Sequence, residues 1–213
     1  MDLTSTDSLH LSGRRVVITS LHPTSKRAWR EEQLRRLNRA LRAVYEATRI
    51  RLQAASEAEL HTATCIALVG GGQLIACWIA WKRDADAGAV DILAAAGQAR
   101  GYIEDCAPHW LPERADGEPT AKAIAEGRLQ MAAHLDRNTA RQRWKQSAGD
   151  HGIGALLALP LFQAGKAVAA ITLCTQDTAE FSAEEISLFQ QFAEAHMAAA
   201  TRLRTAADTQ SRI

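Results

Sequence analysis

Apolar positions recur at alternating steps of three and four residues in two segments, one near each end of the chain. This spacing is typical of amphipathic helices whose apolar seam faces another helix. We therefore predict one helix from about Lys26 and another from about Ser182. The seam residues expected at a dimer contact are Leu34, Leu37, Leu41 and Val44 in the first helix and Ile186, Phe189, Ala193 and His196 in the second. For His196 a place at an interface or in the core is favoured over metal ligation.

A different pattern, apolar at every position, runs from Leu74 to Trp81. Both alternate sets of side chains are hydrophobic, so this strand should be covered on both faces. It is expected to form a hairpin with a second strand over Ala89 to Ala96. Ala155 to Leu161 and Lys166 to Cys174, joined by a turn at Gly165, predict another hairpin.

Local signals place the remaining elements. Ser56-Glu-Ala-Glu59 matches a capping box and predicts a helix over Glu57 to Val69, stopped by three glycines. Glycines and prolines favour irregular structure over residues 97–120. The elements expected after this segment are a helix from Pro119 to Glu126, a strand from Leu129 to Leu135, a short helix capped by Asn138 or Thr139 that carries Trp144, and the last helix with Ser182 as its N-cap.

Length and composition indicate one α+β domain. A chain of 213 residues with 47% hydrophobic residues can bury one substantial core. We predict a partly ordered leader over residues 1–25, with an edge strand at Arg15 to Thr19. Residues 26–208 form the domain with its flanking helices, and residues 209–213 form a tail.

The charge pattern excludes several classes of partner. The net charge of +1 gives no global attraction to nucleic acid or acidic membranes. Between Arg14 and Arg51 there are 11 basic and three acidic residues, and a solvated helix face explains this excess better than a polyanion-binding arm. The first 30 residues hold no signal-peptide pattern, and the uncharged stretch from Thr62 to Trp81 is broken by glycines. We expect a cytoplasmic protein without nucleic-acid or membrane binding.

No enzyme motif stands out. Cys65, Cys77, Cys106 and Cys174 have neither metal-ligand nor disulfide spacing, so reduced and mostly buried thiols without a metal are expected. The phosphate-binding loop, the His-Glu-x-x-His zinc motif, the Gly-x-Ser-x-Gly nucleophile motif and the cyclase motif are missing. The chain is therefore not expected to be an enzyme.

The most informative feature of the sequence is the order in which several short motifs follow one another. Gly117-Glu-Pro-Thr120 is followed by Ala123-Ile-Ala-Glu-Gly127, Trp144, the strand from Ala155 to Leu161 and Phe181-Ser-Ala-Glu-Glu185. From about Leu34 to Leu203 this order resembles a GAF domain, and most closely the GAF domains that precede diguanylate cyclase modules in bacteria. A departure occurs at His134-Leu135, where such domains often have an aspartate before the apolar residue.

The resemblance implies both a fold and a function. The fold would be an antiparallel sheet of about five or six strands, with the N- and C-terminal helices on one face and a loop-covered pocket on the other. The protein would be a homodimeric sensory domain that binds a small ligand of unknown identity and signals through its terminal helices, in cyclic-di-GMP signalling. The side chains expected at the pocket are Trp78, Tyr102, Cys106, Trp110, His134 and Trp144.

Three alternatives remain open at this point. The first is a dimerisation module with an empty pocket. The second is a haem or other tetrapyrrole sensor, for which Cys106, His109 or His134 would supply an axial ligand, although no covalent C-x-x-C-H attachment is present. The third is a free methionine sulfoxide reductase, which needs an accessible low-pKa thiolate; Cys106 is the one cysteine expected in a loop. Cyclic-nucleotide binding is disfavoured, because the Asn-Lys-x-Phe-Asp-Glu set of such domains is missing.

Overall fold

The computed structural model describes residues 6–11, 14–19, 23–71, 74–83, 90–106, 117–135 and 142–210. Its contacts divide the chain into two units, residues 1–36 and 37–213. The first unit holds an antiparallel hairpin of β1 (Thr6–Leu11) and β2 (Arg14–Thr19), followed by the beginning of α1 (Pro23–Gln53). The edge strand predicted from Arg15 therefore forms, but its partner is β1 in a separate two-stranded sheet.

The second unit is built on a five-stranded antiparallel sheet with the order β4-β3-β7-β6-β5. Its strands are β3 (Ala76–Lys82), β4 (Val90–Gly97), β5 (Gln130–Ala132), β6 (Ala155–Gln163) and β7 (Lys166–Thr175). Both predicted hairpins are present, and the turn between β6 and β7 uses Ala164 and Gly165 at positive φ. The predicted α+β class with an antiparallel sheet is confirmed.

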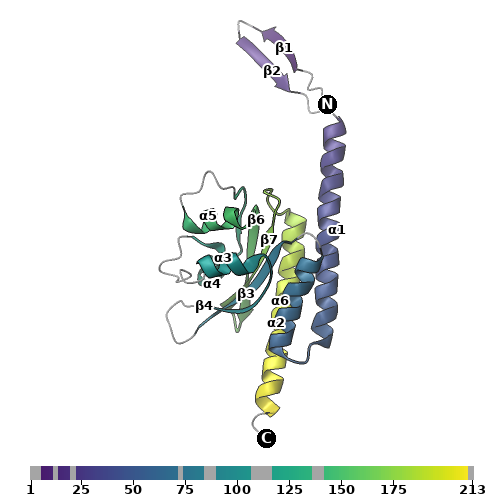
Figure 1. Ribbon diagram of the computed structural model, residues 1–213. Helices are drawn as coiled ribbons and strands as arrows, with labels where there is room; N and C mark the ends of the chain where they lie inside the picture. Colours follow the sequence, from purple (N-terminus) through teal and green to yellow (C-terminus); the bar gives the residue numbers. More distant parts are fainter. Residues whose placement is uncertain are drawn as a thin grey trace. The chain divides into compact units, whose positions relative to one another are not determined.

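Helices cover both faces of this sheet (Figure 1). They are α2 (Glu57–Gly70), α3 (Ala99–Cys106), α4 (Pro119–Glu126), α5 (Arg143–Asp150) and α6 (Ala183–Gln210). Cys77 and Ile79 of β3 and Ile171 of β7 join the first core cluster, which contains residues of α2 and α6. Trp78 and Ala170, which lie on the opposite face of the same strands, join the second core cluster with residues of α3, α4 and α5.

Two capping boxes fix the starts of the long helices next to the sheet. Ser56 Oγ accepts the Glu59 amide at 3.2 Å, as the sequence predicted. At α6, Ser182 Oγ accepts the Glu185 amide, and Glu185 Oε2 accepts the Ser182 amide in return at 2.9 Å. Each box satisfies amides that the first turn of a helix leaves without a partner.

The structure gives the two predicted helix seams different surroundings. On α1 the buried line within the second unit is Ala40, Ala43 and Ala47, each fully buried, whereas Leu41 is 49% exposed. On α6 the buried line does include Phe189, Ala193 and His196, but these side chains pack inside the domain itself. Heptad spacing identifies an apolar face without saying whether the covering partner lies in the same chain, and on α6 that partner is largely the domain itself.

The segment before Gly117 contains a helix where the sequence favoured irregular structure. Gly101 lies inside α3, and a Cβ on it would stand 2.3 Å from Cε1 of His151. This glycine therefore allows a close approach of the His151 ring to the helix instead of ending it. Further along, β5 is shorter than predicted, and α5 starts after Gln142, whose side chain makes no cap hydrogen bond. The predicted caps, Asn138 and Thr139, lie outside the described residues.

None of the helices in the described ranges is both long enough and apolar enough to cross a membrane.

Two glycines in left-handed conformation allow a test of how closely the end of β4 packs against the backbone at Ile75. Gly97 (φ +74°) and Gly165 (φ +77°) should both be strained by alanine, at about 1 kcal/mol. A Cβ on Gly97 would also meet the Ile75 carbonyl oxygen at 2.1 Å, while a Cβ on Gly165 meets no atom within 4 Å. We expect Gly97→Ala to lower the free energy of unfolding in urea clearly more than Gly165→Ala does. Equal losses of unfolding free energy would show that the positive φ alone, and not the contact with Ile75, accounts for the effect of both substitutions.

Candidate functional site

Polar side chains gather inside the second core cluster, beneath α3 and α4. We call Trp78, Tyr102, Glu118, Thr120 and Thr172 the Glu118 cluster. They come from β3, α3, the residue before α4, α4 itself and β7, and none is more than 2% exposed. An acidic residue is seldom buried so completely unless it is paired or hydrogen-bonded.

The Gly117-Glu-Pro-Thr120 motif folds into the start of α4. Gly117 adopts φ +78°, and Glu118 is the N-cap residue, with Oε2 accepting the Ala121 amide at 3.0 Å. Pro119 occupies the first turn, where a missing N–H costs nothing. The carboxylate is thus held at the positive end of a helix, where a negative charge is favoured.

The hydrogen bonds of the cluster have a defined direction. Thr120 donates its hydroxyl proton to Glu118 Oε1 at 2.9 Å, and Tyr102 donates to the same oxygen at 3.3 Å. Because the single hydroxyl proton of Thr120 is used in this way, Thr172 must be the donor in its 2.9 Å contact with Thr120. Trp78 Nε1 also donates to Thr120, at 3.3 Å. These bonds join the start of α4 to two strands of the sheet.

Burial controls the electrostatics of the cluster. Desolvation raises the pKa of Glu118 to about 7, outweighing the donors at Ala121, Thr120 and Tyr102 that favour the charged form. The pKa of Tyr102 is raised in turn, first by its own burial and then by the neighbouring Glu118 charge. Trp78 and Tyr102 lie with their ring centroids 5.4 Å apart, so the carboxyl group adjoins an aromatic wall.

The thiols do not have the properties of nucleophiles. All four cysteines are free and buried. Cys106, which was expected in a loop, lies at the end of α3, and burial raises its pKa to about 11. On the other face of the sheet Cys77 donates to Cys65 at 3.7 Å, and burial raises the pKa of Cys77 as well. A reactive cysteine needs the opposite shift.

A second set of polar contacts joins α3 to α5 at the rim of this region. Ser147 donates to Asp105 Oδ2 at 3.0 Å, and His151 Nε2 lies 3.1 Å from the same oxygen. The hydrogen bonds from His151 and then Ser147 lower the pKa of Asp105. These contacts hold together the two helices that cover the aromatic wall.

Four of the six predicted ligand residues meet in the second core cluster, namely Trp78, Tyr102, Cys106 and Trp144. His134 is exposed, with φ +54°, and does not belong to the cluster. Trp110 and His109 lie outside the described residues. Glu118, Thr120 and Thr172 were not predicted from the sequence, although an acid inside the motif and a threonine inside an apolar strand were available signals.

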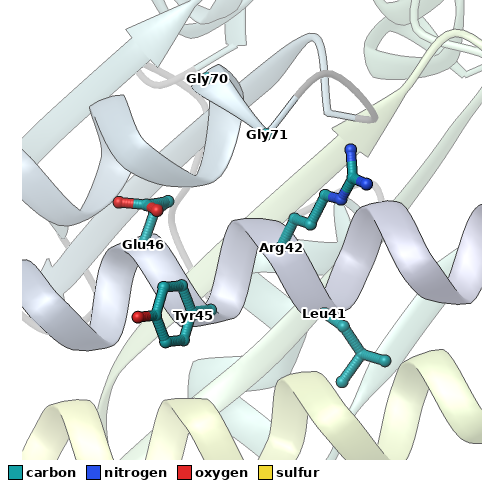
Figure 2. Close-up of a pocket in the computed structure, with 6 residues that line it drawn as sticks. All are labelled: Leu41, Arg42, Tyr45, Glu46, Gly70 and Gly71. Carbon is teal, nitrogen blue, oxygen red and sulfur yellow. The ribbon is translucent and has the colours of Figure 1, made fainter.

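A groove of about 650 Å³ lies elsewhere, between α1 and the end of α2 (Figure 2). It is lined by Leu41, Arg42, Tyr45, Glu46, Gly70 and Gly71. In Figure 2 the Arg42 and Glu46 side chains extend toward the α2 terminus, while Leu41 and Tyr45 project to the other side of α1. The predicted ligand residues do not line this groove. Among the described residues, no group of three His, Cys, Asp or Glu side chains is arranged to hold a metal ion.

The domain is of the α+β class, with an antiparallel sheet, long helices on one face and a buried polar cluster under short helices on the other. The family model for the GAF domain matches residues 54–200, more than half of the chain. The protein therefore belongs to the GAF domain family, one of the sensory families of signalling proteins. No curated protein sequence matches the chain.

Solved structures with the same fold come from proteins of several different kinds. A domain assigned to a two-component sensor histidine kinase protein of Sinorhizobium meliloti is 18% identical, with a TM-score of 0.54, over 71% of this chain and 95% of that one. The GAF domain of a phosphoenolpyruvate-protein phosphotransferase from Coxiella burnetii is 12% identical, with a TM-score of 0.59, over 81% and 98%. A free methionine-R-sulfoxide reductase from Neisseria meningitidis, in complex with its substrate, is 11% identical, with a TM-score of 0.57, over 78% and 91%. At these identities the similarity shows the fold alone.

The raised pKa of Glu118 makes a prediction about stability. In the unfolded chain this carboxyl group ionises near its ordinary pKa of 4.5, whereas in the folded chain it ionises at about 7. The folded state therefore holds the proton more tightly, and stability should fall as pH rises from 4.5 to 7 and change little above that. Glu118→Gln removes this titration, so the stability of wild type relative to this variant should fall by about 3 kcal/mol between pH 4.5 and 8.

Urea unfolding at several pH values measures this difference. Glu184→Gln, in the exposed first turn of α6, is the matched control and should follow the wild-type profile. Parallel profiles for wild type and Glu118→Gln would contradict a raised pKa at this site.

Proposed function

We propose that this chain is a sensory GAF domain that binds a small molecule on the α3–α5 side of its sheet and passes the signal to an output domain through its terminal helices. The observation that carries this proposal is the fully buried Glu118 carboxyl group, raised in pKa and set against the Trp78 and Tyr102 rings. Strongly perturbed ionisable groups concentrate at functional sites. A few polar groups within an aromatic wall are also what a small-molecule site requires.

The sheet supplies a physical route for the signal. Trp78 and Thr172 belong to the Glu118 cluster, and the adjacent Ile79 and Ile171 contact the first core cluster beside α2 and α6. A ligand that moves Trp78 therefore acts on a strand whose other face packs against the long helices. The ligand must bind the two helix arrangements with different affinities for this shift to become a signal.

We further propose that the output belongs to cyclic-di-GMP signalling in the cytoplasm, on the basis of the resemblance to GAF domains that precede diguanylate cyclase modules. The chain itself is proposed to have no catalytic activity. The raised pKa of Cys106 argues against thiol chemistry of the reductase type. An empty dimerisation module remains the competing function.

Ligand binding should be visible in the protein as purified. Native mass spectrometry compared with denaturing mass spectrometry should reveal a released small molecule. If the protein is purified empty, a metabolite screen should find a compound that raises the melting temperature, because a ligand of the folded state stabilises it by mass action. Tyr102→Phe, which removes only the hydroxyl bond to Glu118, should reduce that shift. A complete screen without any shift would favour the empty module.

The proposed homodimer must use side chains that the domain leaves uncovered. Leu41, Tyr45 and Leu52 on α1 are 49%, 64% and 77% exposed and follow one another at heptad spacing, while the α6 seam is buried. We expect Leu41→Glu to give monomers in size-exclusion chromatography with light scattering. Ile66→Glu, at the 58% exposed Ile66 on α2, is the control and should stay dimeric. A Leu41→Glu dimer would contradict a contact through this face.

A further inference from the structure

A second buried polar network lies between α2 and α6, separate from the Glu118 cluster. His61 Nδ1 and His196 Nε2 are 2.9 Å apart, and both side chains are almost fully buried. His61 Nε2 lies 3.3 Å from Glu57 Oε1, and Thr64 Oγ1 lies 3.4 Å from His196 Nδ1. Arg204 of α6 completes the network by an ion pair with Glu57.

The chemistry of these groups fixes where the protons are. Glu57, paired with Arg204, is an acceptor, so His61 must donate to it through Nε2. A neutral His61 then has a bare Nδ1, which accepts from His196 Nε2–H. His196 Nδ1 is consequently bare and accepts the Thr64 hydroxyl. Donation runs in one direction, from Thr64 through both histidines to Glu57, and requires both imidazoles to be neutral.

The same network fastens α6 to the domain. Arg204 donates to Glu57 at 2.9 Å and to Gln163 Oε1 of β6 at 3.4 Å, and its guanidinium lies 4.3 Å from the centroid of the Trp81 ring. Beside it, Leu60 packs with Ala199 and Ala200. From Thr205 to Gln210 the helix is exposed on every side. The contacts around His196 and Arg204 therefore lie where the buried part of α6 ends.

We propose that the His61–His196 pair makes the proton a second input to this domain: acid charges the pair and releases the end of α6 from α2. This inference does not depend on ligand binding at the Glu118 cluster.

The effect of each added proton follows from the tautomers. A first proton taken from solvent by His196 Nδ1 turns Thr64 from donor to acceptor and leaves a buried imidazolium. A second proton, at His61 Nδ1, places an N–H against the His196 N–H and breaks the 2.9 Å bond. The charged groups facing the pair are Arg51 of α1, Glu57 of α2 and Arg204 of α6, so two cations oppose one anion. The surroundings favour neutral imidazoles until the contact opens.

The sign of the pH effect is consistent with this geometry. Burial lowers the pKa of His196 to about 3, with the His61 and Arg51 charges adding to the shift, and burial also lowers the pKa of His61. A histidine whose pKa is depressed in the closed state takes up its proton on opening. The closed state should therefore lose stability as pH falls below about 6.5, by up to tenfold in its equilibrium constant per pH unit and per histidine.

Hydrogen exchange of the full chain at pH 7.5, 6 and 5 tests the proposal, with each rate divided by that of an unstructured peptide at the same pH. We expect the protection of residues 197–204 to fall by about an order of magnitude between pH 6 and 5, while that of β6 and β7 changes less. His196→Gln keeps a donor toward His61 but cannot be charged, and should flatten this pH dependence. His151→Gln, a histidine beside α5, is the matched control and should retain the wild-type profile.

Imidazole nitrogen NMR of the wild-type chain decides the matter even if His196→Gln fails to fold. Both histidines should be neutral at pH 6, each carrying its proton on Nε2. The proposal is overturned if His196 takes up a proton near pH 6.5 while α6 stays protected, if either ring carries its proton on Nδ1, or if protection in His196→Gln falls with acid as it does in wild type.

Discussion

The fold depends on two strands that cannot face water on either side. β3 and β7 lie next to each other inside the sheet, and their side chains are buried on both faces over most of their length. Covers are therefore required on both faces, and the chain supplies α2 and α6 for one and α3, α4 and α5 for the other. One pair of strands therefore belongs to both cores, and the two faces of the sheet share its backbone.

Both faces contain ionisable groups that burial drives toward neutrality. Desolvation raises the pKa of Glu118 on one side and lowers the pKa of His196 on the other, so each group moves toward its uncharged form. The two networks differ in their attachments. The Glu118 network ties a short helix and its cap to the sheet, whereas the histidine network ties two long helices to each other. The first network therefore holds α4 on the sheet, and the second holds α6 on α2.

The sequence predicted those features that depend on neighbouring residues, and it did not predict those that depend on contacts between distant segments. The capping boxes at Ser56 and Ser182, the hairpins and the two-sided strand are local patterns, and each predicted its element correctly. Gly101 was misleading because a glycine that ends a helix and one that admits a neighbouring ring look alike until His151 is placed. Of the candidate site, Trp78 and Tyr102 were named from their residue types. The position of Glu118 inside the motif was visible in the sequence, but its burial was not, because that results from α3, α4 and β7 meeting in space.

The buried face of α1 has a geometric consequence. Ala40, Ala43 and Ala47 present methyl groups to the domain, and Gly71 lies so close to Ala43 that it has no room for a side chain. Alanine loses no rotamer freedom on burial and offers no long side chain to interlock with its neighbours. Ridges along such a surface are low, so the backbone of α1 approaches its support closely at these positions, while Val44 and Ile50 supply the larger side-chain contacts to the same core. The separation between α1 and the end of α2 is therefore set by small residues on both sides, Ala43 and Gly71.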